Sequence, residues 1–119
     1  MRPLVLAGAI LLGYVSGCTH RASLGLTQSV PELIDQAAAA YHVPAARMRR
    51  IGWCESNFLP GAVNPRTGAA GVFQWLPRSW AWASVQAGFG GASVFDPYAN
   101  IYTAAWAMSR NLWGWWVCR

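Results

Sequence analysis

The chain is poor in charged side chains: it has no lysine and only four acidic residues among 119. All nine basic residues are arginine, which gives a formal net charge of +5 at pH 7. A basic surface suits an anionic polymer such as a cell wall, a membrane surface or a nucleic acid. The composition by itself does not choose among these partners.

Three further absences bound the kind of protein. His20 and His42 stand apart without metal-ligand spacing, and we therefore expect no metal ion and no cofactor. No segment repeats, and the length allows only one small domain. The apolar run at residues 4–15 is too short to span a bilayer comfortably as a helix.

The N-terminus instead matches a secretory signal, with residues 4–15 as its hydrophobic core. The residues Val-Ser-Gly-Cys at positions 15–18 resemble the lipobox of bacterial lipoproteins, where the chain is cut before the cysteine and the cysteine is acylated. This resemblance implies a signal peptide over residues 1–17 and a lipid on Cys18, followed by a linker to residue 28. The protein is then expected in the cell envelope, anchored to a membrane by its lipid. An ordinary signal peptide or an uncleaved anchor is the alternative.

Three cysteines are an odd number for an exported protein. If Cys18 carries a lipid, Cys54 and Cys118 remain, and an oxidising compartment favours a disulfide between them. Closing a loop of about 65 residues is worth roughly 4 kcal/mol through its effect on the unfolded chain. Such a link matters to a small domain with a modest core, and it ties the penultimate residue to the position before Glu55.

Helix and loop signals alternate after the linker and predict a mainly α domain over residues 29–119, with at most a very small sheet. Ser29 and Glu32 match a capping box at the start of the first helix. Prolines suit the first turns of the next helices, and Asp96 is a good N-cap for the last one. The predicted helices cover residues 33–41, 44–56, 77–86 and 97–112. Residues 71–75 are apolar and are expected to form a short strand or an extended segment.

One carboxylate lies where the helix pattern places apolar side chains. Met48, Ile51 and Gly52 share one face of the predicted second helix, and Glu55 continues that face. A helix turns such a face toward the core, where burial raises the pKa of a carboxyl, as a general acid at neutral pH requires. The alternative is a glutamate exposed to water at the helix end.

Three ordered segments resemble the motifs of lytic transglycosylases of the lysozyme-like superfamily. The first is Trp-Cys-Glu-Ser-Asn-Phe at positions 53–58, where a Glu-Ser pair ends a helix. The second, residues 64–77, contains a Gly-Ala-x-Gly-apolar-apolar-Gln run followed by an aromatic residue and a proline. The third, residues 96–101, is similar to the family's Ala-x-Asn-Ile helix start. The resemblance covers roughly residues 31–112 and implies a compact lysozyme-like domain; the cysteine before the glutamate is also similar to that of resuscitation-promoting factors.

The resemblance implies that Glu55 is the catalytic acid and base. It protonates the glycosidic oxygen that joins N-acetylmuramic acid to N-acetylglucosamine, and then takes a proton from the 6-hydroxyl of the muramic sugar, which closes a 1,6-anhydro ring. The substrate's acetamido group stabilises the positive C1 between these steps, so one carboxylate suffices. The other carboxylates agree with this, because Glu32 and Asp96 have capping roles and Asp35 has no special context.

The matching polar residues Ser56, Gln74 and Asn100 are expected to hydrogen-bond Glu55 or the sugar. For Gln74 and Asn100, a bond to the local backbone is the alternative. Trp75 is expected either to stack on a sugar or to pack in the core. The C-terminal tryptophans are expected to pack around the disulfide: Trp113, Trp115 and Trp116.

The chain departs from the family at Ala107, where a tyrosine is usual. Trp106 or Tyr102 would fill the space without the same hydroxyl. Three functions therefore remain: a lytic transglycosylase, a hydrolytic muramidase in which water replaces the 6-hydroxyl, and a wall-binding lipoprotein with weak or no activity. In each case the expected partner is the glycan strand of peptidoglycan rather than a nucleic acid, and we expect a monomer.

Overall fold

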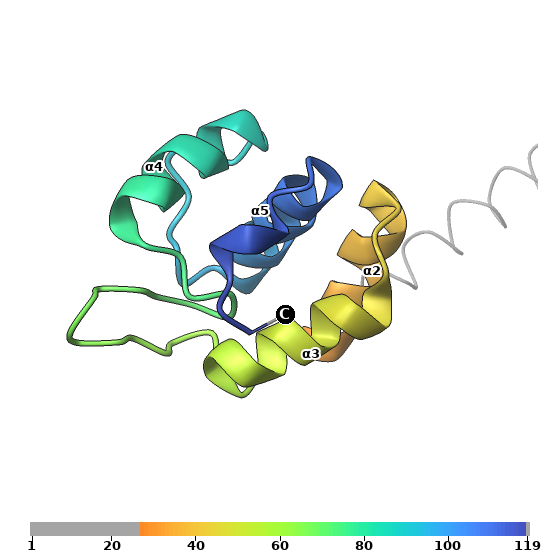
Figure 1. Ribbon diagram of the computed structural model, residues 1–119, viewed down its shortest axis with the longest axis horizontal. Helices are drawn as coiled ribbons and strands as arrows, with labels where there is room; N and C mark the ends of the chain where they lie inside the picture. Colours follow the sequence, from red (N-terminus) through yellow and green to blue (C-terminus); the bar gives the residue numbers. More distant parts are fainter. Residues whose placement is uncertain (1–26, 119) are drawn as a thin grey trace, which may run out of the picture.

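The computed structural model describes residues 27–118, and within this range it contains α-helices, one short 3-10 helix and connecting loops (Figure 1). The helices are α2 (Val30–Tyr41), α3 (Ala45–Ser56), α4 (Pro77–Gln86), α5 (Pro97–Ser109) and the 3-10 helix η1 (Trp113–Trp115). The predicted signal peptide, Cys18 and most of the predicted linker lie outside the described residues. None of the helices within residues 27–118 is both long and apolar enough to cross a bilayer.

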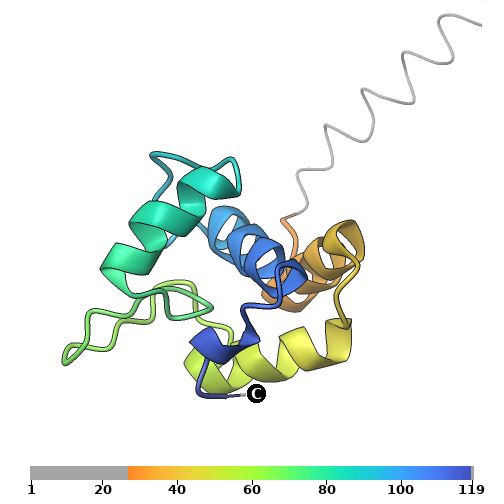
Figure 2. The same ribbon diagram turned by 45° about the horizontal axis from the view of Figure 1, so that its top comes forward.

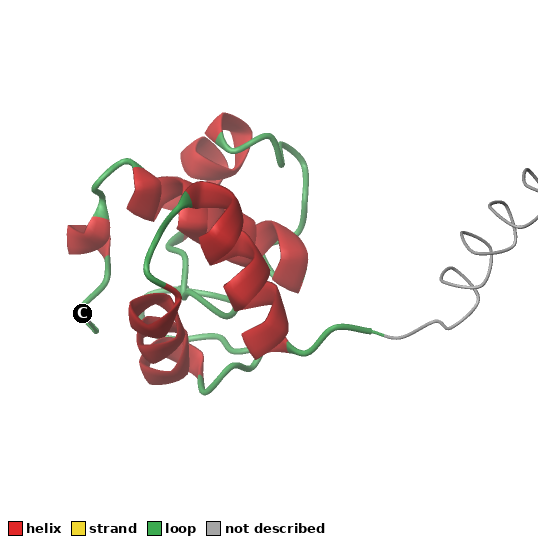
Figure 3. Cartoon of the chain, turned by 90° about the vertical axis from the view of Figure 1, so that its right-hand side faces the viewer, coloured by secondary structure: helices red, strands yellow, loops and turns green. Residues whose placement is uncertain are grey.

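The predicted mainly α class is confirmed. Over the described part of the chain, β-pairing is limited to two isolated bridges, from Val63 to Ala70 and from Ala70 to Trp75 (Figure 3). The predicted short strand over residues 71–75 is absent. These residues form a tight turn, closed by two hydrogen bonds of 3.0 and 2.9 Å between the backbones of Ala70 and Trp75.

The helix starts follow the capping signals. The hydroxyl of Ser29 accepts from the backbone N–H of Glu32, and the Glu32 carboxylate accepts from the N–H of Ser29, so the predicted capping box is confirmed. Asp96 accepts from the N–H groups of Tyr98 and Ala99 at the start of α5. Pro44 was expected in the first turn of α3. It is instead the N-cap of this helix.

The last helix is shorter than predicted. It ends at Ser109 instead of near Leu112, because Asn111 takes a left-handed conformation with a φ of 65°. The N–H of Leu112 then bonds back to the carbonyl of Ala107 at 3.1 Å, which closes the helix end. The chain turns there into η1, which brings the C-terminal residues back toward α3 (Figure 2).

Helix α5 forms the centre of the domain, since it packs against α2 on one side and α4 on the other, while α2 also packs against α3 (Figure 2). Nine of the thirteen residues of α5 are buried, and four of the nine are alanines whose small side chains let neighbouring helices approach closely. The largest side chains that are fully enclosed come from several elements: Phe73, Ile34, Met48, Ile51, Ile101 and Met108. The end of α3 therefore lies against a well-filled core.

Candidate active site

Glu55 lies at the end of α3, one residue before the last residue of that helix. The face it shares is buried as predicted: Met48 and Ile51 are 0% exposed, and Gly52 is also buried. Glu55 itself is half-buried. The carboxyl therefore lies at the edge of the apolar core, as expected from the buried face of α3, and it is not fully exposed to water at the helix end.

Gly52 brings the backbone of α3 close to the core beside this carboxyl. A Cβ atom at Gly52 would lie 3.2 Å from Cδ1 of Ile34 and 3.3 Å from Cζ of Phe73. Contacts this short leave room for hydrogen but not for a methyl group without movement of the neighbours. The glycine thus allows the last turn of α3 to sit directly on the apolar side chains.

The pKa of Glu55 is raised above its ordinary value, and burial is the larger cause. A smaller, opposite effect comes from the backbone N–H of Cys118, which lowers the pKa by stabilising the carboxylate. No charged side chain within residues 27–118 contributes to the shift. A carboxyl that keeps its proton to higher pH is suited to general acid catalysis.

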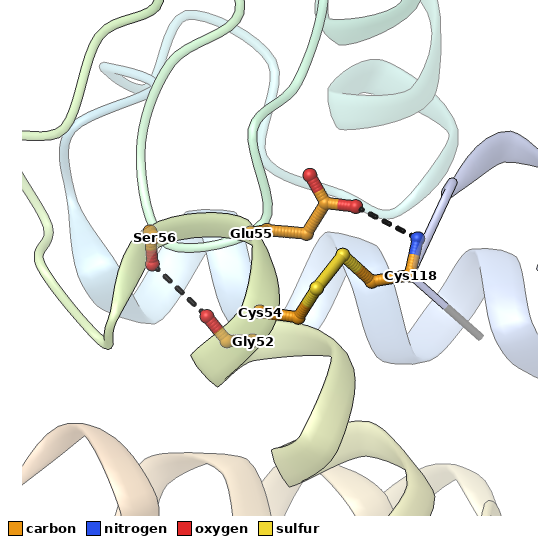
Figure 4. Close-up of a disulfide and its surroundings, with 5 residues drawn as sticks. All are labelled: Gly52, Cys54, Glu55, Ser56 and Cys118. Carbon is orange, nitrogen blue, oxygen red and sulfur yellow. Dashed lines mark hydrogen bonds between the residues drawn. A yellow bond between two sulfur atoms is a disulfide. The ribbon is translucent and has the colours of Figure 1, made fainter.

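The predicted disulfide between Cys54 and Cys118 is present, and their Cα atoms are 6.0 Å apart (Figure 4). It holds the end of the chain beside the last turn of α3. The N–H of Cys118 donates to Oε1 of Glu55 over a long distance of 3.5 Å. The sequence pattern did not reveal this backbone donor, although the pairing of Cys54 with the penultimate residue was a signal that the C-terminus reaches Glu55.

Ser56 has a different role from the one predicted. Its side chain is buried, and its hydroxyl donates to the carbonyl of Gly52 at 3.1 Å, one turn earlier in α3. In Figure 4 the hydroxyl points away from the Glu55 carboxyl. Ser56 therefore stabilises the end of the helix that carries the acid.

Asn100 lies in the first turns of α5 and is 0% exposed. Its Oδ1 accepts from the N–H of Phe73 at 2.9 Å, and its Nδ2 donates to the carbonyl of Val94 at 2.8 Å. A third, longer bond of 3.4 Å runs from Nδ2 to the carbonyl of Ala70. An enclosed amide has no surface to offer a sugar, so the predicted substrate contact of Asn100 is corrected to a structural one.

Gln74 is the predicted polar residue that remains at the surface. It adopts a φ of 48°, and its Nε2 donates to the carbonyls of Ala62 and Gly71 at 3.1 and 2.9 Å. These bonds hold the side chain against the turn. A shallow pocket beside it is lined by Gln74, Trp75, Leu76, Ser79, Trp115 and Trp116.

The structure shows which tryptophans are buried and which have an exposed ring. Trp75 is 3% exposed, and its indole N–H donates to the carbonyl of Asn100 at 3.3 Å. Of the two roles expected for Trp75, the structure therefore agrees with packing in the core and not with stacking on a sugar. Trp115, expected to pack around the disulfide, is 44% exposed on the same pocket. Trp116 is buried as expected. No local sequence signal separates Trp115 from Trp116, because the two are adjacent in an irregular segment.

The neighbours of Ala107 do not replace the tyrosine of the family. Ala107 is 0% exposed within α5. The ring of Tyr102 stacks on Tyr98 with centroids 4.3 Å apart, and Trp106 packs edge-on against Trp82. The donor that reaches Glu55 is instead the backbone amide of Cys118.

The remaining polar features serve the fold. Asp35 forms a bidentate ion pair with Arg49, and the guanidinium of Arg47 lies 4.0 Å from the ring centre of Trp113. Within the described residues there is no group of three side chains suited to hold a metal ion. A wider hollow at the start of α2 contains none of the predicted site residues, and it is lined by Thr27, Gln28, Glu32, Asp35 and Gln36.

A helical domain with one half-buried carboxyl at the end of a helix is consistent with a lysozyme-like domain. Residues 32–115 match the model of the transglycosylase SLT domain, and the chain belongs to this family. No curated protein and no solved structure matches the chain significantly. Membership of the family supports a peptidoglycan-cleaving function of the lytic transglycosylase type.

Proposed function

We propose that the protein is a peptidoglycan lytic transglycosylase that cleaves the β-1,4 bond between N-acetylmuramic acid and N-acetylglucosamine, with Glu55 as its single acid and base. The observation that carries the proposal is the half-buried carboxyl of Glu55, whose pKa is raised chiefly by burial. Glu55 lies within residues 32–115 that match the family, in the segment that resembles its catalytic motif. A proton held there is available to the bridging oxygen of a glycan strand.

The distribution of the acids supports a mechanism with one carboxylate. Glu32 is engaged in the capping box of α2, and Asp35 pairs with Arg49. Asp96 caps α5 through two backbone N–H groups. A mechanism with two carboxylates needs the second one within roughly 5 to 10 Å of the first, on the other side of the scissile bond. The three other acids are committed to structural contacts, so the substrate's acetamido group takes the place of a second carboxylate.

The reaction then proceeds in two proton transfers. Glu55 gives its proton to the glycosidic oxygen, the bond to C1 breaks, and the acetamido oxygen closes on C1 as an oxazolinium. The Glu55 carboxylate next takes the proton of the 6-hydroxyl, whose oxygen attacks C1 and releases the acetamido group. The acid is restored, and the product ends in a 1,6-anhydro sugar.

Substrate binding is assigned to the surface that includes Gln74 and Trp115. Gln74 offers an amide at the edge of the pocket, and Trp115 offers an exposed ring face of the kind that packs against sugars. We also retain the lipid on Cys18 as part of the proposal. A lipid at this position would anchor the domain to a membrane of the cell envelope, within reach of the cell wall.

Digestion of purified sacculi tests this function. The proposal predicts soluble muropeptides with 1,6-anhydro ends in mass spectrometry, and none with Glu55→Gln at equal concentration. Reducing ends in place of anhydro ends would identify a hydrolytic muramidase. Binding to sacculi without release of muropeptides by the parent would identify a wall-binding protein and overturn the proposal.

A further inference from the structure

The C-terminal segment reaches Glu55 by way of the disulfide. The cross-link joins Cys118 to Cys54, the neighbour of Glu55 in α3, with 6.0 Å between the Cα atoms (Figure 4). On the same side, the Cys118 N–H faces Oε1 of Glu55 at 3.5 Å. The cross-link and the donor thus belong to one residue, and both act on one turn of helix.

The two residues before Cys118 show what holds it in place. Trp116 is 4% exposed, its indole N–H donates to the carbonyl of Phe73 at 2.8 Å, and its ring packs against that of Trp75. Val117 is 94% exposed and therefore contributes no packing. The chain is anchored by the core at Trp116, and the disulfide fixes Cys118 two residues later.

We propose that Cys118, held by its disulfide to Cys54, is a positioning residue for Glu55, so that glycan cleavage depends on the oxidised state of this cysteine pair. The proposal rests on the proposed function of Glu55 as the acid. The backbone amide limits the rotamers of a long side chain and presents one carboxyl oxygen in a constant direction. Reduction releases the amide and leaves Glu55 attached to the same helix, without its donor.

The reason for such a device lies in the packing of this domain. Ala107 of α5 is a buried alanine and provides no hydroxyl, and the hydroxyl of Ser56 is used by the carbonyl of Gly52. The backbone N–H of residue 118 survives substitution by any residue except proline, but its position beside Glu55 is lost when the chain end moves. The disulfide is therefore the feature on which the contact depends.

The chain offers a direct measurement, because Glu32 and Glu55 are its only glutamates. Glutamate labelled with ¹³C at the carboxyl gives two signals in NMR, and Glu32→Gln assigns them. All proteins carry Cys18→Ser, so that Cys54 and Cys118 are the only cysteines of the parent. In Cys54→Ser/Cys118→Ser we expect the pKa of Glu55 to rise above that of the oxidised parent, because the carboxyl stays at the buried face of α3 while its donor is lost. The signal of Glu32, which lies in the capping box of α2, serves as the internal reference.

An unchanged pKa of Glu55 overturns the proposal, because it means that the amide of Cys118 has no effect on the carboxyl. A lowered pKa also overturns it, because it means that the C-terminal segment affects Glu55 only by burying it. A second variant covers the case in which the double variant does not fold. Residue 118 is penultimate, so peptide ligation can install N-methylcysteine there, which keeps the disulfide and removes only the N–H. The pKa of Glu55 is again expected to rise. A pKa of Glu55 equal to that of the parent overturns the proposal.

Kinetics on sacculi provide the second readout. We expect each variant to lose about tenfold in kcat with little change in KM, because a displaced acid reacts more slowly while the sugar-binding surface is intact. Ser29→Ala, which weakens the cap of α2 far from Glu55, is the destabilised control and keeps the parental kcat. Cleavage by the oxidised parent, absent in Glu55→Gln, establishes the proposed function separately. If the parent cleaves and the variants cleave equally well, only the positioning role fails.

Discussion

Glu55 combines two opposing demands at the scale of a single residue. Its position on the buried face of α3 gives the carboxyl the raised pKa that an acid catalyst needs. The same burial removes water from the charged form, which destabilises the folded protein at neutral pH. Glu55 is thus expected to favour activity over stability, as residues in active sites often do.

Replacement of Glu55 by glutamine is expected to raise the melting temperature at pH 7 while abolishing cleavage. Because the pKa is raised by folding, the folded state binds more protons than the unfolded state between the ordinary glutamate pKa and the raised one. The stability of the parent therefore falls as pH rises through this window, and the variant escapes that loss. Thermal melts at pH 7 and at about pH 3, below the window, measure the difference, which should vanish at the lower pH. A variant that melts below the parent at pH 7 would contradict this account.

The same raised pKa predicts the pH dependence of cleavage. In the proposed mechanism protonated Glu55 is the reactive form, so kcat should fall as pH rises through the raised pKa of this residue, above the ordinary glutamate range. Initial rates of muropeptide release in buffers of constant ionic strength provide the profile. A fall in rate already centred at the ordinary glutamate pKa would mean that burial does not tune this acid.

At the scale of elements, the turn of residues 70–75 depends on a close fit to α5. Asn100 binds the N–H of Phe73 and the carbonyl of Val94 from inside the domain. Gly71 has a φ of 80°, in the left-handed region that favours glycine. A Cβ there would come within 2.1 Å of Nδ2 of Asn100. The two segments that resemble family motifs, around Gly71 and around Asn100, therefore pack directly against each other.

Gly71→Ala is expected to destabilise the protein by at least about 3 kcal/mol, because it adds both backbone strain and a clash with a buried amide. Gly61→Ala is the matched control, since a Cβ at Gly61 meets nothing within 4 Å and its φ is not in the strained range. Urea unfolding of both variants measures the contrast. Equal stability of the two would show that the turn accommodates a side chain and that the contact is not specific.

At the scale of the whole molecule, the disulfide closes the domain across most of its length. It joins residues separated by 64 positions, from the end of α3 to the end of the chain. Within the loop that the disulfide closes, Trp82 of α4 contacts Trp115 of η1 edge-on. The C-terminal segment thus contributes to stability, to the acid and to the proposed sugar-binding surface.

Cys54→Ser/Cys118→Ser is expected to lose about 4 kcal/mol of unfolding free energy, because a long loop is no longer closed in the unfolded state. Urea unfolding at constant temperature measures the loss. Cys18→Ser alone is the control and should leave the value unchanged. A loss below about 1 kcal/mol would mean that the unfolded chain is already compact enough to make the link redundant.

Trp115→Ala is expected to raise KM for sacculi about fivefold, with kcat nearly unchanged, because an exposed indole face contributes about 1 kcal/mol to packing against a sugar. Trp113→Ala is the control, since Arg47 covers the ring of Trp113 at 4.0 Å. Saturation curves for released muropeptides separate the two parameters. An equal effect of both substitutions would assign Trp115 a general role in the C-terminal segment rather than contact with the glycan.

The sequence by itself determined the features that depend on local patterns. The helix starts at Ser29 and Asp96 follow from capping side chains, and the place of Glu55 follows from the period of α3. The pairing of Cys54 with Cys118, which the structure contains, was predicted from the odd number of cysteines together with the expected lipid on Cys18. These inferences hold because the interacting groups are either a few residues apart or the only ones of their kind.

Only the tertiary structure decided which polar and aromatic residues face the solvent. Asn100 is enclosed because the turn at Phe73 folds onto it from a distant part of the chain. Trp115 is exposed and Trp116 is buried because η1 ends at Trp115 and the chain continues in an extended conformation at Trp116. The donor to Glu55 is a backbone amide, which every residue but proline carries, so no residue type could mark it. Contacts between distant segments of the chain decide which of these similar groups is buried or bonded, and a local sequence pattern does not predict those contacts.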